Sequence, residues 1–205
     1  MLKCSHTQPP SQLGLMPKKI DPNERRRELV LASWDVLCAD GLEGVSLRRV
    51  ADAANCTTGR IAHYFEGRDQ LLIASLRMAN AQAAERMQAI AESEADSLKR
   101  LRAILMESLP LDTRRLKEWQ VWLSFWAASI GHKDLAVENQ RRYAEWRAAL
   151  QSALRALTSE SDATILADRL VTLIDGLGIG VTLDPSKEKR RRAEAEVDAF
   201  LNSLR

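Results

Sequence analysis

The sequence is poor in residues that mark several protein classes. Its three cysteines, Cys4, Cys38 and Cys56, form no C-x-x-C pair, and two occupy apolar positions of expected helices. This pattern indicates reduced thiols in a cytoplasmic protein. No segment approaches the ~18 apolar residues of a membrane-spanning helix, and the N-terminus lacks the apolar segment of a signal peptide. We therefore expect neither a disulfide-stapled nor a membrane-bound protein.

Enzyme signatures are missing as well. The sequence contains no Glu-x-x-His pair for a di-metal bundle, no glycine-rich phosphate loop and no G-x-S-x-G motif. His6, His63 and His132 are far apart and lack the spacing of metal ligands. We expect no catalytic site, metal or other cofactor, and a helical-bundle enzyme is kept only as a remote alternative.

The chain also lacks an excess of charge of either sign, because its 30 Lys and Arg residues nearly balance its 28 Asp and Glu residues and leave a formal net charge of +2. A nucleic-acid surface would have to come from the placement of basic residues rather than from bulk charge. Strand patterns and internal repeats are absent, whereas helical periodicity recurs along the chain. With 205 residues, 45% of them hydrophobic, the chain can hold a small domain and a larger one. The sequence predicts an all-α fold of about nine helices.

The stretch 45–65, VSLRRVADAANCTTGRIAHYF, is the most informative part of the sequence. Ser46 precedes a short helix as a good N-cap, and Asn55 tolerates the left-handed conformation that turns the chain after a helix. One apolar face of that helix follows the i, i+3, i+4, i+7 spacing through Leu47, Val50, Ala51 and Ala54. The pattern predicts a helix followed by a tight corner.

A second short helix is expected over residues 58–64, with Thr57 as its N-cap and with Ile61 and Phe65 facing inward. Small, polar and aromatic groups together on an exposed helix suit a surface that enters the DNA major groove. Gly59 adds a position without a side chain. The residues that remain outside are Thr58, Arg60, Ala62, His63 and Tyr64.

This stretch resembles the DNA-binding domain of the tetracycline-repressor (TetR) family of bacterial regulators. The sequence departs from the family pattern at Asn55 for Gly, Cys56 for Val and Ala62 for Tyr. It matches the pattern at Ser46, Leu47, Val50, Ala51, Ala54, Thr57, Gly59, Ile61, Tyr64, Phe65, Arg68 and Leu71. The resemblance implies a three-helix, helix-turn-helix DNA-binding domain over residues 23–68 and an effector-binding and dimerisation domain over residues 69–205.

Basic residues flank the expected recognition helix. Arginines 25–27 lie at the start of the first long helix, which we expect to begin after Asn23 as its N-cap and to end at Gly41. Cations oppose the helix dipole there, so a phosphate partner would explain them, and solubility is the alternative. Arg68 begins a long linking helix, where a cation and free backbone amides favour a phosphate. The DNA-binding set is Arg26, Arg27, Ser46, Thr57, Thr58, Gly59, Arg60, His63, Tyr64 and Arg68.

Residues 1–22, rich in proline, are expected to form a flexible tail that either touches phosphates or is simply solvated.

Aromatic residues make up only 5% of the chain, yet most tryptophans gather in residues 119–146. Such a stripe at helical spacing is either core packing or the wall of a ligand pocket. Aromatic faces bind cations with roughly 0.5–2 kcal/mol each, so with Glu118 or Glu138 nearby the cluster would suit a quaternary ammonium compound. The candidate effector residues are Glu118, Trp119, Trp122, Trp126, Tyr143 and Trp146.

The segments KEWQVWLSFWAASIGHKDL and TLIDGLGIG resemble the effector domain of the betaine-inhibitor (BetI) branch of the same family. The resemblance implies a repressor that responds to choline or to another small molecule.

Gly176 and Gly180 form a G-x-x-x-G on an apolar helix, which either allows close helix approach or reflects fraying near Pro185. In the family the last two helices form a dimer interface, which here would contain Leu173, Gly176, Leu177, Gly180, Phe200 and Leu201. The basic run 187–192 is expected to be a solvated face, with a nucleic-acid patch as the minor alternative.

Together these features predict a homodimeric repressor at the bacterial nucleoid that binds an inverted-repeat operator in double-stranded DNA. A small-molecule effector, choline or another cation, would release it. Two alternatives remain open: a regulator with a hydrophobic or drug-like ligand, and an orphan regulator that needs no ligand.

Overall fold

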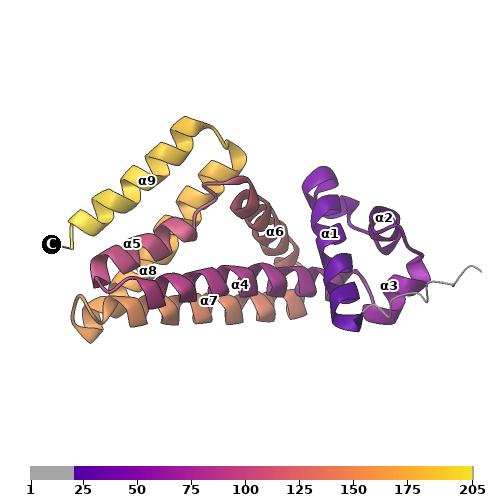
Figure 1. Ribbon diagram of the computed structural model, residues 1–205, viewed down its shortest axis with the longest axis horizontal. Helices are drawn as coiled ribbons and strands as arrows, with labels where there is room; N and C mark the ends of the chain where they lie inside the picture. Colours follow the sequence, from indigo (N-terminus) through magenta and orange to yellow (C-terminus); the bar gives the residue numbers. More distant parts are fainter. Residues whose placement is uncertain (1–20, 205) are drawn as a thin grey trace, which may run out of the picture.

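The protein is described over residues 21–204 by a computed structural model. Of the tail expected over residues 1–22, residues 1–20 lie outside this range, whereas Asp21 and Pro22 belong to the start of the first helix. Within the range the chain is all-α, as predicted, and elongated (Figure 1). The expected helices are all found, and most of their ends lie within three residues of the predicted positions. The helices are α1 (Pro22–Gly44), α2 (Leu47–Ala53), α3 (Thr58–Tyr64), α4 (Arg68–Ser93), α5 (Ser97–Glu107), α6 (Thr113–Ser129), α7 (Lys133–Leu154), α8 (Glu160–Leu183) and α9 (Lys187–Asn202).

The first helix begins earlier than expected. The Asp21 carboxylate accepts a hydrogen bond of 2.9 Å from the Asn23 backbone N–H, so Asp21 is the N-cap and Asn23 is not. Pro22 then stands at the first helical position, where its missing N–H costs nothing. At the other end Gly41 has a φ of 70° and kinks the helix. The predicted stop at Gly41 is therefore a kink, after which a last short turn runs to Gly44.

Two hydrophobic cores divide the molecule. The first joins α1, α2, α3 and the start of α4, and it includes Val121 and Phe125 of α6 and Leu135 of α7. The second joins α5 to α9 around Trp119, Leu150 and Ala167. Because α6 and α7 contribute to both cores, the recognition end is packed directly on the larger bundle rather than attached through α4 alone.

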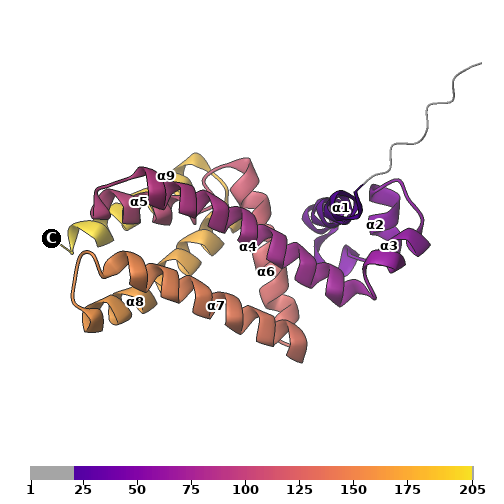
Figure 2. The same cartoon turned by 60° about the horizontal axis from the view of Figure 1, so that its bottom comes forward.

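Helix α4 runs along the molecule from α3 to the far end of the bundle (Figure 2). Two arginines tie it to its neighbours. Arg77 donates to Glu138 of α7 at 3.1 and 3.0 Å, and Arg86 donates to Glu118 of α6 at 3.0 and 2.6 Å. A shift of α6 or α7 will therefore act directly on α4.

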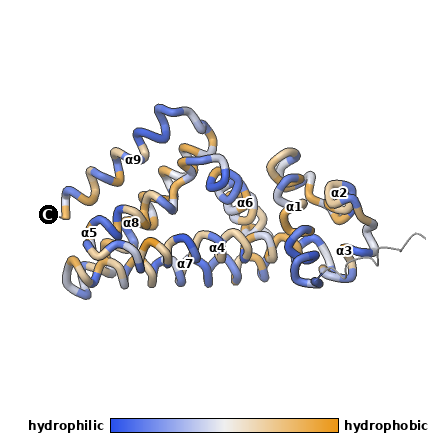
Figure 3. Tube along the Cα trace, in the orientation of Figure 1, coloured by the Kyte–Doolittle hydropathy of each residue, from blue (hydrophilic) through white to orange (hydrophobic). Residues whose placement is uncertain are grey.

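None of the helices in residues 21–204 combines the length and apolar character needed to cross a membrane. The tube in Figure 3 shows the first half of α9 as hydrophilic, whereas α8 carries long hydrophobic stretches.

Candidate DNA-binding surface and effector site

The corner between α2 and α3 has the geometry of a helix-turn-helix. The Ser46 hydroxyl accepts from the Arg49 N–H at 3.3 Å, and the Thr57 hydroxyl accepts from the Arg60 N–H at 3.3 Å, so both predicted N-caps are confirmed. Asn55 has a φ of 49°, the predicted left-handed conformation. These local bonds fix the angle at which α3 leaves the corner.

Helix α3 is anchored on one side only. Ile61 and Phe65 are fully buried in the first core, and Tyr64 packs against that core while half-buried. The His63 ring stands edge-on to the Tyr64 ring, with 5.2 Å between centroids. The other residues of the helix, Thr58, Gly59, Arg60, Ala62 and His63, are exposed. A short helix with one anchored and one free face can enter a groove without loss of its own packing.

The flanking arginines differ in what they contact. Arg26 lies over the Phe65 ring at 4.8 Å, which holds an exposed cation next to the end of α3. Arg27 is exposed, whereas Arg25 pairs with Glu28. Arg68 donates through Nη2 to the Leu42 carbonyl at 2.7 Å, and its Nε is buried. Only the rest of the Arg68 guanidinium is free for the phosphate contact predicted from the sequence.

The five predicted aromatic residues of the effector region do not contribute equally. The Trp119 ring lies 5.4 Å from Trp122 and 5.8 Å from Trp126, and Trp126 lies 5.9 Å from Tyr143 of α7. Trp146 packs on the second core. Four rings from two helices therefore form one continuous chain of aromatic contacts, which we call the aromatic cluster: Trp119, Trp122, Trp126 and Tyr143.

Trp119 is the structural centre of this cluster. Its side chain is buried, and its indole N–H donates to the Ser108 carbonyl at 2.8 Å. A Cβ added at Gly178 of α8 would lie 1.9 Å from the Trp119 ring. Gly178, which lies between the two glycines singled out from the sequence, is therefore the one that permits close packing within a single chain.

Gly176 and Gly180 have a different environment. A Cβ built on either residue meets no atom within 4 Å in the described part of the chain. Leu173, Leu177 and Phe200 are half-buried, whereas Leu201 is only 4% exposed in the core of its own chain. The predicted interface thus retains an open face of α8, but the Leu201 side chain is already used internally.

The two glutamates proposed to attract a cation are already neutralised by arginines. Glu118 is fully buried and is paired with Arg86, as described above. Glu138 is 7% exposed and accepts from Arg77 and from Arg142. The hydrogen bonds from Arg77, together with those from Arg142, lower the pKa of Glu138 from 4.5 to about 2 in spite of its burial. Both carboxylates act as ties between helices.

A third carboxylate at the cluster was not singled out from the sequence. Asp175 of α8 accepts a hydrogen bond of 2.8 Å from the Tyr143 hydroxyl, and burial raises the pKa of this carboxyl. The segment that contains Asp175, TLIDGLGIG, is indicated by the sequence only through its resemblance to the BetI branch. The spacing of Asp175 on α8 could have indicated its position. It lies three residues before Gly178, on the side of α8 that faces Trp119 of α6.

A cavity of about 240 Å³ lies apart from the aromatic cluster, between the end of α1, the start of α4 and the α6–α7 turn. Its walls include Arg68 and Asp69 at the start of α4, Leu42 of α1 and His132 of the α6–α7 turn. Space is therefore present next to the first turn of α4, where a tilt of that helix would begin.

No group of three or more His, Cys, Asp or Glu side chains suited to a metal ion occurs within residues 21–204.

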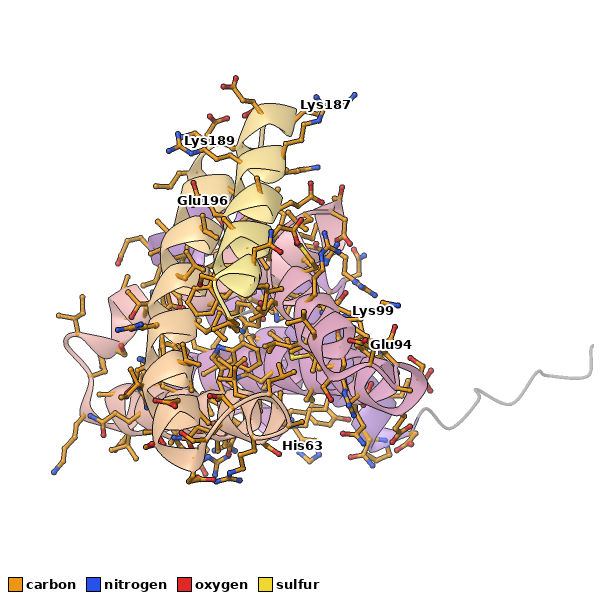
Figure 4. All side chains as sticks on the ribbon, turned by 90° about the vertical axis from the view of Figure 1, so that its left-hand side faces the viewer. His63, Glu94, Lys99, Lys187, Lys189 and Glu196 are labelled. Atoms are coloured by element: carbon orange, nitrogen blue, oxygen red, sulfur yellow. The ribbon has the colours of Figure 1, made fainter. Side chains whose placement is uncertain are left out.

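The basic run 187–192 lies on α9. Figure 4 shows Lys187 and Lys189 at the start of this helix, across the molecule from His63 of α3. The basic run of α9 is exposed except for the half-buried Arg190. It is separate from the recognition helix, so it does not extend the candidate DNA-binding surface.

Known proteins match both parts of this structure. Residues 29–75 match the model for bacterial regulatory proteins of the tetR family, and residues 97–205 match the C-terminal model for BetI-type transcriptional repressors. The BetI regulator of Paraburkholderia phymatum is 31% identical over 196 residues, which cover 91% of this chain and 97% of that protein. The PksA regulator of Bacillus subtilis is 29% identical over 199 residues, with 92% and 94% coverage.

Solved structures agree with these matches. A transcriptional regulator from Saccharomonospora viridis, crystallised in complex with choline, superposes with a TM-score of 0.80 at 25% identity and covers 88% of this chain and 96% of its own. The resemblance seen in the sequence is therefore confirmed, and the protein is a regulator rather than an enzyme. The chain belongs to the TetR family of bacterial DNA-binding regulators and carries the C-terminal domain of a BetI-type transcriptional repressor.

Proposed function

We propose that the protein is a homodimeric repressor that binds an inverted-repeat operator and is released by a small cationic effector, choline or a related compound. The observation that carries the proposal is the aromatic cluster, in which four rings from α6 and α7 lie within 5.9 Å of a neighbour. Aromatic faces attract cations, and the attraction grows when the site excludes water. The choline complex of the Saccharomonospora regulator supports the same class of ligand.

The DNA contacts of this proposal come from the exposed face of α3 and the residues around it. Arg60 and His63 would reach base edges, and Tyr64 would contact bases or the backbone. Thr57, Thr58, Gly59, Arg26 and Arg27 would lie against phosphates, together with the free part of the Arg68 guanidinium. Such a division is usual, because phosphate contacts position a protein and base contacts give specificity.

The dimer would form through the open face of α8. Gly176 and Gly180 leave room for close approach of a second helix, and on the same face the exposed side chains of Ile165 and Leu183 offer apolar surface. A two-fold axis through this face gives each chain the same contacts and presents two α3 helices to the two half-sites of an operator.

The effector signal would pass through α4. Glu118 is adjacent to Trp119 in α6 and holds Arg86 of α4, so a ligand that moves the aromatic cluster pulls on this helix. The tilt would change the separation of the two α3 helices. Its effect on DNA affinity is limited to the ligand's preference between the two conformations, typically about 1–3 kcal/mol.

Footprinting on the DNA next to the protein's own gene tests the proposal. We expect protection of an inverted repeat with half-sites about one helical turn apart or a little more, and loss of protection on addition of choline. In the Trp126→Ala variant protection should persist in the presence of choline. Protection that choline leaves unchanged in the wild-type protein would contradict the cationic effector and favour a different ligand or none.

The dimer has its own test. Gly180→Leu places a bulky side chain on the open face of α8 and should yield monomer or aggregate in sedimentation, whereas an exposed substitution on α9, Lys189→Leu, should leave the dimer intact. An intact Gly180→Leu dimer of wild-type affinity would place the interface elsewhere.

A further inference from the structure

Of the carboxylates Glu118 of α6, Glu138 of α7 and Asp175 of α8, only Asp175 lacks a basic partner among residues 21–204. Glu118 holds Arg86, and Glu138 holds Arg77 and Arg142. Asp175 forms no ion pair with any Lys, Arg or His among residues 21–204, and its only hydrogen-bond partner there is the Tyr143 hydroxyl. The electrostatic difference among the three acids is therefore large.

An ionised carboxylate removed from water is costly unless it is paired with a charge. Glu118 and Glu138 meet this condition through their arginines. Asp175 is half-buried and has only a neutral donor, which is why its pKa rises whereas that of Glu138 falls. A cation placed beside Asp175 would remove this cost, so the position favours a positively charged ligand.

The surroundings of Asp175 come from three helices. Tyr143 of α7 donates to Asp175 of α8, and the Tyr143 ring lies 5.9 Å from Trp126 of α6. Trp126 and Tyr143 are both half-buried. The carboxylate thus stands at the edge of the aromatic cluster, next to ring faces that attract cations.

We infer that Asp175 is the anionic group of the effector site and that the effector is a small monocation held between this carboxylate and the rings of Trp126 and Tyr143. The inference rests on the proposed function and assigns the charge recognition to a residue outside the six candidates that the sequence suggested. Glu118 and Glu138 act only as positioning residues for α4.

A second polar group restricts the chemical class of the ligand further. The Trp122 indole N–H is buried and has no hydrogen-bond partner among the described residues, whereas the neighbouring Trp119 indole N–H is satisfied by Ser108. A buried donor without an acceptor is unfavourable. A ligand oxygen would satisfy it, so the preferred monocation carries a hydroxyl or carboxylate oxygen close to its charge.

Calorimetry with three probes separates these contributions. Choline carries both the charge and the oxygen, tetramethylammonium carries the charge alone, and 3,3-dimethylbutan-1-ol carries the oxygen alone. For the wild-type protein we expect choline to bind more tightly than tetramethylammonium and far more tightly than the neutral alcohol.

The Asp175→Asn variant should bind choline and tetramethylammonium about 10- to 100-fold more weakly, since a hydrogen bond or ion pair with a charged group contributes about 1.5–3 kcal/mol. Its affinity for the neutral alcohol should be unchanged. Asp168→Asn is the matched control, because Asp168 lies two turns earlier on α8, is exposed and pairs with Arg147; it should bind all three probes as the wild type does.

The Trp122→Phe variant should remove the preference for choline over tetramethylammonium while retaining tetramethylammonium binding. Choline binding that is equal in the wild type and Asp175→Asn would overturn the inference and leave the proposed function standing. A preference for choline that Trp122→Phe retains would overturn the assignment of the oxygen contact. A wild-type protein that binds neither cation would overturn the cationic effector altogether, and footprinting with other ligands would then decide the rest of the proposed function.

Discussion

The recognition end and the effector end of this protein use their polar side chains in opposite ways. Around α3 the polar groups are exposed, and Arg60 and His63 form no ion pair within the described residues. At the effector end two carboxylates of α6 and α7, Glu118 and Glu138, are buried and are paired across helices with Arg86 and Arg77 of α4. Exposed unpaired groups are available to a partner, whereas buried paired groups hold the fold.

This difference predicts how the two ends respond to substitution. A change at the effector end should alter stability first, because it removes partners from buried groups. A change on the exposed face of α3 should alter DNA affinity and leave stability within about 0.5 kcal/mol. Asp175 is the exception at the effector end, since its carboxylate has no basic partner in residues 21–204.

The largest effect is expected at Gly178. In Gly178→Ala the new methyl group would lie 1.9 Å from the Trp119 ring, so the ring or the helix must move. Overpacking of this kind costs about 1–3 kcal/mol, or about 2–12 °C in the melting temperature of a chain of this size. Gly131→Ala is the control, because a Cβ at this exposed position in the α6–α7 turn would meet no atom within 4 Å, and it should not lower the melting temperature. Equal melting temperatures for both variants would show that the cluster is loosely packed.

Glu138 gives the next largest effect, and that effect depends on pH. Its pKa lies at about 2 instead of 4.5, because arginines stabilise the charged form. A lowered pKa contributes stability that is complete above pH 4.5 and is lost as the pH falls toward 2. Glu138→Gln should therefore lower the unfolding free energy by about 2 kcal/mol at pH 7, and the difference from wild type should shrink as the pH falls below 4.5.

Glu145→Gln serves as the control for this pH series, because Glu145 lies on the same helix but is exposed. Its melting temperature should follow that of the wild type across the same range. A difference between Glu138→Gln and wild type that stays constant from pH 7 to pH 3 would contradict the role of the arginine pair.

Arg60 tests the recognition end. Arg60→Ala should weaken operator binding by about 1–2 kcal/mol and relax specificity at one base position, with an unchanged melting temperature. Arg49 offers a contrast, since its guanidinium is held by Asp40 at 2.6 Å; Arg49→Ala should alter operator specificity far less. Anisotropy titrations with operator variants would distinguish the two arginines, and wild-type specificity in Arg60→Ala would remove it from the base contacts.

The smallest effect concerns Arg27. As an exposed cation at the start of α1, it should contribute one phosphate contact, so Arg27→Ala should weaken binding to all sequences alike and reduce the slope of log K against log salt by ~1. Arg25, which pairs with Glu28, should leave the slope unchanged when replaced. Equal slopes for wild type and Arg27→Ala would place the start of α1 away from the DNA.

The same contrast explains what could be predicted from the sequence. The corner at Ser46, Asn55 and Thr57 depends on bonds between residues at most five apart, and these follow from local preferences. The helix order and the aromatic stripe follow from periodicity. Local signals therefore sufficed for the all-α class, the order of the helices and the caps of the recognition helix, whereas the division into two domains came from the family resemblance.

Ion pairs and hydrogen bonds between residues far apart in the sequence could not be predicted from local signals. Nothing near Glu118 in the sequence shows that Arg86, 32 residues earlier, will neutralise it, or that Tyr143 will donate to Asp175, 32 residues later. The start of α1 was misplaced because Asp21 and Asn23 are both good caps, and Pro22 at the first helical position favours Asp21. Charge pairing across helices depends on tertiary packing, which periodicity does not specify.

The most direct test of the account follows DNA release and cluster occupancy in one titration. Choline is added to the protein on fluorescently labelled operator DNA, with anisotropy reporting the DNA and tryptophan fluorescence reporting the aromatic cluster. We predict that both signals change with one midpoint in the wild type and that this shared midpoint rises about 10- to 100-fold in Asp175→Asn. A tryptophan signal that saturates while the operator stays bound would contradict the account, because the cluster would then bind a ligand without controlling the DNA.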